Sequence, residues 1–376
     1  MIPKNITFIL CFLIILRINA QQKNYDNKYL SFADSTLTVL QNNWCTHDWN
    51  CSDSTTNPWQ MKNIWNAYNT AEALIDYINT SGNKDFLPLI ENFMDNECAF
   101  LDSKYAGYDD AQWTAITLIK TFQLTQNKKY LDKAVELWNY IVENSWDEKF
   151  CGGGLWWNVE RTYKNAITNE LFLMLSTMLY LETGETLYKN WALKVWKWFT
   201  ESGMISEKTG GRKIKNLIND GLNRSCKNNE GEIWTYNQAV ILGGLTNLWK
   251  ITSDSSYIIK AVEIAETAIQ NLSENNILKE RTDLSLNTDQ QQFKGIFIRY
   301  LAYLTINLPD KLQNEKEYFK NFVFYNADFV WRYNKQGEIN TYWSEKSQEK
   351  HNFLCTPISQ TSGLDLFNAA ILLYQK

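Results

Sequence analysis

Hydrophobic residues recur every three to four positions along most of the chain, which is the spacing of a helix with a buried face. No convincing run alternates apolar and polar residues as a half-buried strand would. Only five prolines occur in 376 residues, so little interrupts helix formation. The sequence therefore predicts an all-α protein.

The predicted helices come in pairs. The first member of each pair carries charged residues on one side and spans 28–42, 84–96, 130–145, 187–202, 257–272 and 312–331. The second is more apolar, contains small residues and spans 64–79, 110–124, 165–182, 235–251, 290–305 and 357–374. Helices of mixed polarity belong outside, and helices that are apolar nearly all round belong inside. Six hairpins closing on themselves predict an (α/α)6 barrel. Because no Pro/Gly/Ser-rich linker interrupts the pattern, we expect one domain over 21–376.

The first twenty residues resemble a secretory signal peptide. Lys4 precedes an apolar run over 6–16, which is too short to span a bilayer, and Ala20 ends a small-residue cleavage site. The C-terminal residues lack a polar spacer followed by a long apolar tail, so no GPI anchor is expected. The sequence therefore predicts a secreted protein, or a periplasmic one in a bacterium, without a membrane anchor.

Six cysteines follow residue 20, and an even number is typical of disulfides in an oxidising compartment. They are Cys45, Cys51, Cys98, Cys151, Cys226 and Cys355. The short separation makes Cys45–Cys51 the favoured pair. No Cys-x-x-Cys occurs and the chain has only two histidines, so we expect neither a metal nor another cofactor.

Composition narrows the class of ligand. The chain has 16 Trp and 20 Tyr, and the flat faces of these side chains suit stacking on sugar rings. Most of them would nevertheless be core residues. The net charge is −5 and no basic stripe occurs, which argues against nucleic acid as a partner.

Two adjacent carboxylates, Asp109 and Asp110, follow Gly107 at the start of an apolar helical run. One interpretation is structural: Asp109 caps the helix and Asp110 favours its dipole. The other is catalytic, because glycoside hydrolysis needs one carboxylate and one protonated carboxylic acid. Like charges this close push the two pKa values apart, so one carboxyl stays protonated near neutral pH.

Several loops and helix starts carry polar or aromatic residues that would gather with the aspartates at one mouth of the barrel. Three glycines over 152–154, which would let the backbone approach a ligand, precede Trp156 and Trp157. Further candidates are Asn169, Asp220, Tyr236, Gln238, Lys294 and Gln360. Ligand contact and structural hydrogen bonding explain this set about equally well, since buried polar groups must be bonded either way.

Seven motifs together resemble glycoside hydrolase family 76 over about residues 30–374. They are GYDDAQW, CGGGLWW, KNAITNELF, DGLN, TYNQAVILGGL, DQQQFKGIFIRYL and QTSGLDLFNAA. The resemblance implies an (α/α)6 barrel, endo-α-1,6-mannanase activity with retention of configuration, Asp109 as nucleophile and Asp110 as acid/base. It makes α-mannan or a manno-oligosaccharide the expected partner. From their position at the predicted mouth of the barrel, the candidates for holding mannose units are Trp156, Trp157, Asp220, Tyr236 and Gln238.

Three alternatives remain open. A transglycosidase acting on cell-wall or GPI-linked mannan would use the same aspartates but pass the sugar to another sugar. A catalytically silent mannan-binding protein would keep the groove, although intact Asp109 and Asp110 argue against it. A polysaccharide lyase is disfavoured by the scarcity of His and the acidic charge. We expect a monomer.

Overall fold

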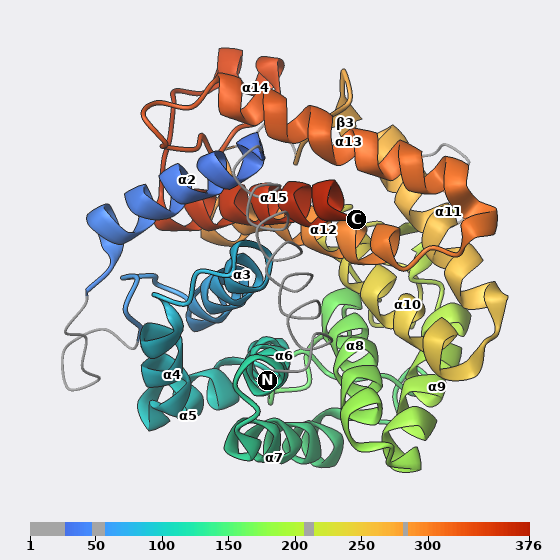
Figure 1. Ribbon diagram of the computed structural model, residues 1–376. Coiled ribbons are helices and arrows are strands. Elements are labelled where there is room, and N and C mark those ends of the chain that lie inside the picture. The colour runs from blue at the N-terminus through green and yellow to red at the C-terminus, as the bar shows by residue number, and fades with distance from the viewer. Residues whose placement is uncertain (1–26, 47–56, 207–213, 281–284) are drawn as a thin grey trace, which may run out of the picture.

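The computed structural model describes residues 27–46, 57–206, 214–280 and 285–376. Six inner helices form a ring: α3 (Ile64–Ser81), α6 (Tyr108–Thr125), α8 (Ala166–Thr183), α10 (Val240–Thr252), α12 (Thr288–Ile306) and α15 (Pro357–Gln375). Each packs on the next, and α15 packs on α3 to close the ring. The predicted all-α (α/α)6 barrel is confirmed (Figure 1).

An outer layer surrounds this ring (Figure 1). It consists of α2 (Lys28–Trp44), α4 (Leu87–Asp95), α5 (Glu97–Ala106), α7 (Lys128–Ser145), α9 (Thr186–Glu201), α11 (Ser255–Asn271) and α13 (Gln313–Arg332). The helices α7, α9, α11 and α13 each pack on the inner helix that precedes them in the chain. The inner helix α15 packs against α2 from the other end of the described chain.

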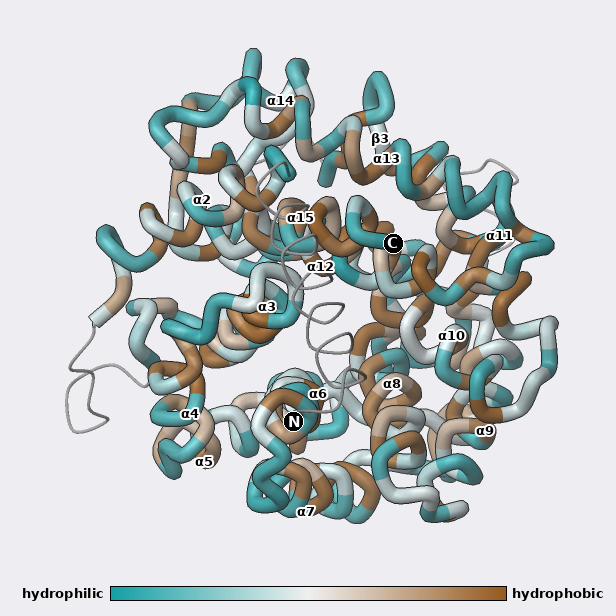
Figure 2. Tube along the Cα trace, viewed as in Figure 1, coloured by the Kyte–Doolittle hydropathy of each residue, from teal (hydrophilic) through white to brown (hydrophobic). Residues whose placement is uncertain are grey.

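The periodicity explains which helices lie inside. Helix α8 is buried without a break from Ala166 to Leu179, as expected for a helix that is apolar all round. Helix α7 buries a single stripe, including Tyr130, Ala134, Leu137 and Ile141, and exposes its charged side. Figure 2 shows the same division, with brown positions turned inward and teal positions at the periphery.

Two predicted helices are interrupted. The predicted outer helix over 84–96 ends at Asp95, where Asn96 takes an extended conformation and accepts a hydrogen bond from the Ala99 amide as N-cap of α5. The helix predicted from 235 starts as the 3-10 turn η1 (Tyr236–Gln238) before α10. Both breaks occur where side chains bond to backbone in place of the helical pattern.

The remaining elements are short. A second 3-10 turn, η2 (Asp310–Leu312), and α14 (Glu345–Lys350) flank α13. Strands β1 (Ile205–Ser206) and β2 (Leu217–Ile218) pair antiparallel with Ile205 opposite Ile218. Strands β3 (Ser273–Glu274) and β4 (Ile277–Leu278) pair antiparallel with Ser273 opposite Leu278.

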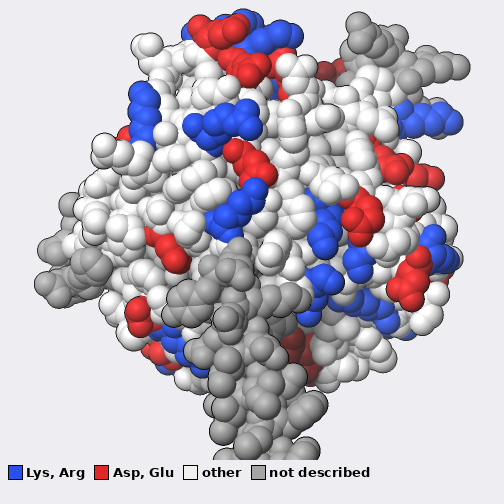
Figure 3. All heavy atoms as spheres, turned by 45° about the horizontal axis from the view of Figure 1, so that its top comes forward, with Lys and Arg blue, Asp and Glu red and all other residues white. Residues whose placement is uncertain are grey.

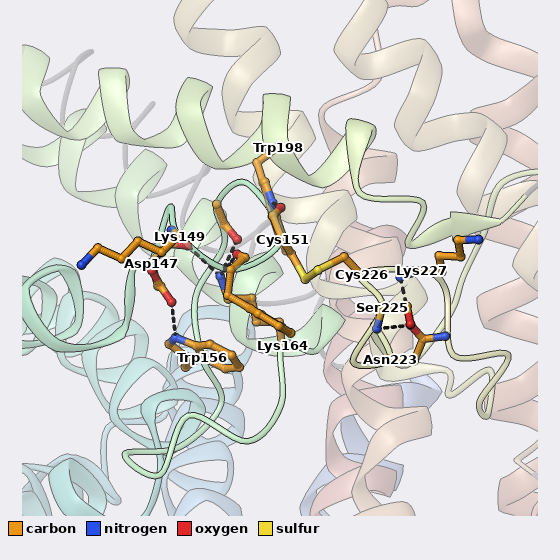
Figure 4. The surroundings of a disulfide bond; sticks show 12 residues. Asp147, Lys149, Cys151, Trp156, Lys164, Trp198, Asn223, Ser225, Cys226 and Lys227 are labelled. Atoms are coloured by element: carbon orange, nitrogen blue, oxygen red, sulfur yellow. Dashed lines mark hydrogen bonds between the residues drawn. A yellow bond between two sulfur atoms is a disulfide. The ribbon is translucent and has the colours of Figure 1, made fainter.

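The disulfide pattern differs from the prediction. Cys151 bonds to Cys226 across a separation of 75 residues, linking the loop after α7 to the loop after β2 (Figure 4). Cys98 is also disulfide-bonded. Cys45 is free, as is Cys355, so the favoured Cys45–Cys51 pair is wrong; Cys51 itself lies outside the described residues. Short separation was a poor guide because folding brings distant loops together.

The surface carries charges of both signs, interspersed over the face shown in Figure 3. Within the described ranges, no helix has the length and apolar character needed to cross a membrane, and no cluster of three or more His, Cys, Asp or Glu side chains could hold a metal ion. The predicted signal peptide over 1–20 lies outside the described residues.

Candidate active site

A cleft of about 530 Å3 opens at the end of the barrel where the inner helices begin. Its walls come from the N-terminal turns of α3, α6 and α12, from α5 and η1, and from the loops that precede α6, α8 and η1. The lining residues are Lys62, Asn63, Ile64, Trp65, Asp102, Ala106, Asp109, Asp110, Trp113, Trp157, Tyr163, Asn165, Asp220, Tyr236, Asp289 and Phe293. Aromatic faces and carboxylates therefore share one concave surface.

Asp109 and Asp110 lie in the first turn of α6, but neither caps it. The N-cap is Gly107, in an extended conformation and without a side chain to bond, so the structural interpretation of Asp109 as the cap is wrong. A Cβ atom at residue 107 would lie 2.7 Å from Asp109 Oδ1 and 3.2 Å from Asp110 Oδ2. The missing side chain thus leaves room for the pair. Because both oxygens lie so close to one point, they are at most 5.9 Å apart.

The two carboxyl groups have different proton affinities. Burial raises the pKa of Asp109 to about 6, while the Trp157 indole and backbone amides at the start of α6 oppose the rise. The pKa of Asp110 is raised well above its usual range by burial and then by the charges of Asp109 and Asp289. The raised pKa of Asp110 favours its protonated form, and the Trp157 and backbone donors favour the ionised form of Asp109.

Trp157 is the side-chain partner of Asp109. Its indole nitrogen donates to Asp109 Oδ2 at 2.9 Å. Its backbone is fixed on both sides, since its carbonyl accepts from the Tyr108 amide at 3.0 Å and its amide donates to the Tyr163 carbonyl at 2.8 Å. The ring remains 40% exposed and so presents an open aromatic edge to the cleft.

Hydrogen bonds from Lys164 hold the loop between α7 and Trp157 in place (Figure 4). The buried Lys164 ammonium donates to the carbonyls of Asp147, Phe150 and Gly153 at 2.6–2.7 Å. A Cβ atom on Gly154 would lie 2.3 Å from the Trp198 ring. We expected the glycines over 152–154 to let the backbone approach a ligand; in the structure Gly153 and Gly154 let it approach Trp198, whereas Gly152 has no neighbour within 4 Å of a Cβ position.

A second polar group forms the opposite wall. The Tyr163 hydroxyl donates to Asp220 Oδ2 at 2.6 Å and accepts from Asn229 at 2.7 Å. The backbone of Asp220 accepts from the Ala166 amide at the start of α8. Burial raises the pKa of Asp220. Tyr236 stacks on Phe293 with ring centroids 3.8 Å apart, which makes a broad aromatic surface beside Asp220.

Sequence reasoning missed Asp289 and Trp65. Asp289 lies in the first turn of α12 and accepts from Asn63 at 2.7 Å and from the Trp65 indole at 3.0 Å. It faces the Asp109–Asp110 pair closely enough for its charge to raise both pKa values. The signal was available, because Asp289, like Asp109, is an acidic residue in the first turn of an inner helix.

Of the ten predicted site residues, the structure brings five to the cleft: Asp109, Asp110, Trp157, Asp220 and Tyr236. Four others make structural hydrogen bonds. Trp156 donates to Asp147, and Asn169 exchanges bonds with the Leu155 backbone. Gln238 bonds both the amide and the carbonyl of Ile218, and Gln360 bonds Ile339, Thr36 and Gly337. Their side chains tie loops to the barrel and do not line the cleft.

The tenth residue, Lys294, is buried beneath the cleft. Its ammonium lies 5.2 Å from the centre of the Trp343 ring, and burial lowers its pKa to about 8 while the charge of Glu280 opposes that change. The Glu280 carboxylate accepts from the Thr235 amide. Lys294 is thus a buried cation influenced by the charge of Glu280 and does not line the cleft.

The chain is similar to several known proteins. The glycosyl hydrolase family 76 profile matches residues 31–376. The chain is 28% identical over 274 residues to mannan endo-1,6-alpha-mannosidase DCW1 of Candida albicans, covering 65% of this chain and 59% of that protein. It is 25% identical over 341 residues to DFG5 of the same species, covering 84% of this chain and 74% of that protein.

Solved structures show the same fold. An inactive variant of the alpha-1,6-mannanase of Salegentibacter sp. HEL1_6, bound to alpha-1,6-mannotriose, superposes with a TM-score of 0.76 at 22% identity over 92% of this chain and 99% of that one. Dfg5 of Chaetomium thermophilum, bound to glucosamine, superposes with a TM-score of 0.73 at 18% identity over 94% and 91%. Because the profile covers nearly the whole chain, the protein belongs to glycosyl hydrolase family 76.

Proposed function

We propose that the protein hydrolyses α-1,6-mannosidic linkages within mannan and retains the configuration of the anomeric carbon. The observation that carries this proposal is the Asp109–Asp110 pair on the floor of the cleft. A retaining pair of carboxyl groups stands about 5–5.5 Å apart, whereas an inverting pair needs about 6.5–9.5 Å to admit a water. The upper limit of 5.9 Å between Asp109 Oδ1 and Asp110 Oδ2 fits the first arrangement.

In the first step, the Asp109 carboxylate attacks the anomeric carbon and Asp110 gives its proton to the departing glycosidic oxygen. The pKa order supports this division, since Asp110 is the more strongly raised of the two. The bond from the anomeric carbon to the glycosidic oxygen breaks, and an ester to Asp109 forms with inversion.

In the second step, Asp110 is ionised and takes a proton from water. The water oxygen attacks the anomeric carbon, the ester to Asp109 breaks, and a second inversion restores the original configuration. Asp110 is protonated again and Asp109 is again a carboxylate, so the pair returns to its starting state.

The choice of substrate rests on the cleft and on the relatives. Trp65, Trp157 and the Tyr236–Phe293 stack offer flat apolar faces to sugar rings. Asp220 and Asp289 offer carboxylate oxygens to sugar hydroxyls. The fungal relatives DCW1 and DFG5 are named mannan endo-1,6-alpha-mannosidases. The Salegentibacter structure is a mannanase inactivated by replacing two consecutive aspartates with asparagine. The chain spans about three fifths of the length of DCW1.

We further propose that the mature chain acts outside the cytoplasm. The apolar leader over 6–16 and the Cys151–Cys226 disulfide both fit an oxidising compartment. Mass determination of the secreted protein would test the leader, because a mature chain that still begins at residue 1 would contradict it.

Incubation with linear α-1,6-mannan, followed by sizing of the products, tests the proposed activity. The wild type should release oligosaccharides of intermediate size early, and Asp109→Asn should release none. Asp132→Asn, at an exposed site on α7, is the matched control and should retain full activity. A folded wild type that binds mannan without cleaving it would reject hydrolysis in favour of a binding protein.

An added acceptor sugar separates hydrolysis from transglycosylation. With methyl α-mannoside present, a hydrolase should give mainly reducing oligosaccharides. A product in which most cleaved chains carry the methyl mannoside would identify a transglycosidase that uses the same pair.

A further inference from the structure

The turn between α7 and Trp157 is organised around one buried cation. Lys164 is 1% exposed. Its ammonium donates to the carbonyls of Asp147, Phe150 and Gly153 at 2.6–2.7 Å (Figure 4). An ammonium has three N–H donors and no acceptor, so each donor has one carbonyl. A neutral amine has only two donors and would leave one of the three carbonyls without a partner.

Aromatic rings surround the same ammonium. The ring centres of Trp156, Phe150 and Trp198 lie 4.8, 5.7 and 6.0 Å from the Lys164 nitrogen. A cation removed from water gains most from such rings. Burial lowers the pKa of Lys164 to about 8, while the charge of Asp147 opposes that change. The ammonium is therefore still charged at about pH 6, where the proposed nucleophile titrates.

The segment that follows this turn carries Trp157 to Asp109. The Trp157 amide donates at 2.8 Å to the carbonyl of Tyr163, the residue before Lys164. The Trp157 indole nitrogen donates to Asp109 Oδ2 at 2.9 Å. The backbone of Tyr163 and the side chain of Lys164 therefore hold Trp157 and the turn that precedes it. These bonds close the chain from 147 to 164 on itself.

Loss of the cation should displace the turn. The bond to the Gly153 carbonyl is buried, and a buried carbonyl without a donor is costly. The turn would therefore open until water reaches the carbonyls that the ammonium now satisfies. Trp156 stacks on Phe150 with ring centroids 5.0 Å apart, so a shift of the turn moves Trp156 and, with it, the neighbouring Trp157.

We propose that Lys164 is a positioning residue for the reaction, because its ammonium holds the turn over 147–153 so that the Trp157 indole stays on the Asp109 carboxylate. Lys164 does not line the cleft. It acts through Trp157 and touches neither the substrate nor the reacting atoms. A buried lysine outside the cleft thereby tunes how readily Asp109 ionises. The inference rests on the proposed role of Asp109 as nucleophile.

NMR of isotope-labelled tryptophan indoles tests the position of Trp157 without any substrate. The signal that is missing from Trp157→Phe identifies this indole. In the wild type it should shift with pH around a midpoint of about 6, because its partner Asp109 ionises there. In Lys164→Met it should lose this shift, since the indole leaves the carboxylate. A folded Lys164→Met protein that keeps the wild-type signal at every pH would overturn the proposal.

Lys194→Met is the matched control. Lys194 reaches the same loop from α9 through side chains at the surface, with its ammonium 2.6 Å from the Glu148 carboxylate and 4.6 Å from the centre of the Trp146 ring. Its replacement should leave the Trp157 signal unchanged, and an equal change in both lysine variants would reject the assignment. If Lys164→Met does not fold, Lys164→Gln takes its place, because the amide can still donate to two of the three carbonyls.

A double-mutant cycle extends the test to the reaction. Lys164→Met should move the acidic limb of the kcat/KM profile to higher pH by about half a unit to one unit, as loss of a hydrogen bond to the Asp109 carboxylate requires. In a protein that already carries Trp157→Phe, it should add no further shift. Equal shifts in both backgrounds would refute action through Trp157. A wild type that leaves mannan uncleaved would reject the proposed function alone, since the indole signal reports on Lys164 without catalysis.

Discussion

The indole N–H of Trp157 donates to Asp109 Oδ2 across 2.9 Å, although 48 positions of the chain separate the two residues. Within the described structure no side chain donates to the neighbouring Asp110 carboxyl. A donor favours the ionised form of the carboxylate it reaches. This single contact therefore distinguishes the two members of the pair and supports Asp109 as the nucleophile.

Trp157→Phe should move the acidic limb of the activity profile to higher pH. Loss of the indole donor removes an interaction that lowers the pKa of Asp109, so the pKa should rise above about 6, by about one unit for a charged hydrogen bond. The profile of kcat/KM against pH measures this. Trp196→Phe, on the outer helix α9, should leave it unchanged, and a uniform loss at every pH would instead indicate lost sugar stacking.

Asp109→Asn should stabilise the folded protein at neutral pH. Burial raises the folded-state pKa of Asp109 from 3.8 to about 6, so between those values the folded chain binds more protons than the unfolded chain. Stability then falls as pH rises through that window. Removing the ionisable group should recover on the order of 1–3 kcal/mol at pH 7 and almost nothing at pH 3.5. Denaturant unfolding at the two pH values measures the difference, and a loss of stability at pH 7 would support a structural role.

Asp110→Asn should affect natural substrates far more than activated aryl mannosides. A good leaving group departs without a proton, so the first step partly survives, while the second lacks its base. A glycosyl-enzyme on Asp109 should accumulate, and azide should restore turnover by giving an α-mannosyl azide. Mass spectrometry detects the ester and NMR the anomer. A β-mannosyl azide, or a β-anomer as first product of the wild type, would reverse the assignment of a double displacement.

Removing the Cys151–Cys226 disulfide should destabilise the barrel and loosen Trp157. Closure of a 75-residue loop corresponds to roughly 4 kcal/mol in the chain-entropy description. In urea unfolding, the double variant Cys151→Ser/Cys226→Ser should lose a free energy of unfolding of this order. It should also lose activity at urea concentrations below its own unfolding midpoint. Cys355→Ser removes a free thiol and is the control; equal losses in both would mean that the bond contributes little.

The fold could be predicted because its signal is local and repeated. The inner helices are more apolar and are buried on most sides, as α8 is from Ala166 to Leu179, whereas an outer helix such as α7 has one apolar stripe. This hydrophobic periodicity can be recognised in the sequence without any knowledge of tertiary contacts. The sequence pattern did not indicate which outer helix packs against α15. In the structure that helix is α2, from the other end of the described chain.

The site could be predicted only where neighbouring motifs favoured one of a residue's possible roles. The two aspartates after Gly107 could cap the helix or act in catalysis, and they met that condition because the family motifs favoured catalysis. Gln238 and Gln360 did not, because a polar side chain on an apolar helix can face a ligand or a backbone amide, and both turned to backbone. Asp289 was overlooked because an acidic residue in the first turn of a helix is ordinarily explained by the dipole.

The packing of α2 on α15 brings the two ends of the described chain together and closes the ring. Figure 1 shows the blue first helix beside the red last one, and the rings of Tyr29 and Tyr374 are 6.5 Å apart. Linear helical repeats have terminal units with one neighbour, which fray first and need polar caps. Here every inner helix has an inner helix on both sides, so none of the six described inner helices is an open end of the array. The barrel should therefore unfold in one cooperative step. A circular permutant in which residue 376 is joined to residue 28, with new termini between α6 and α7, should form the same ring.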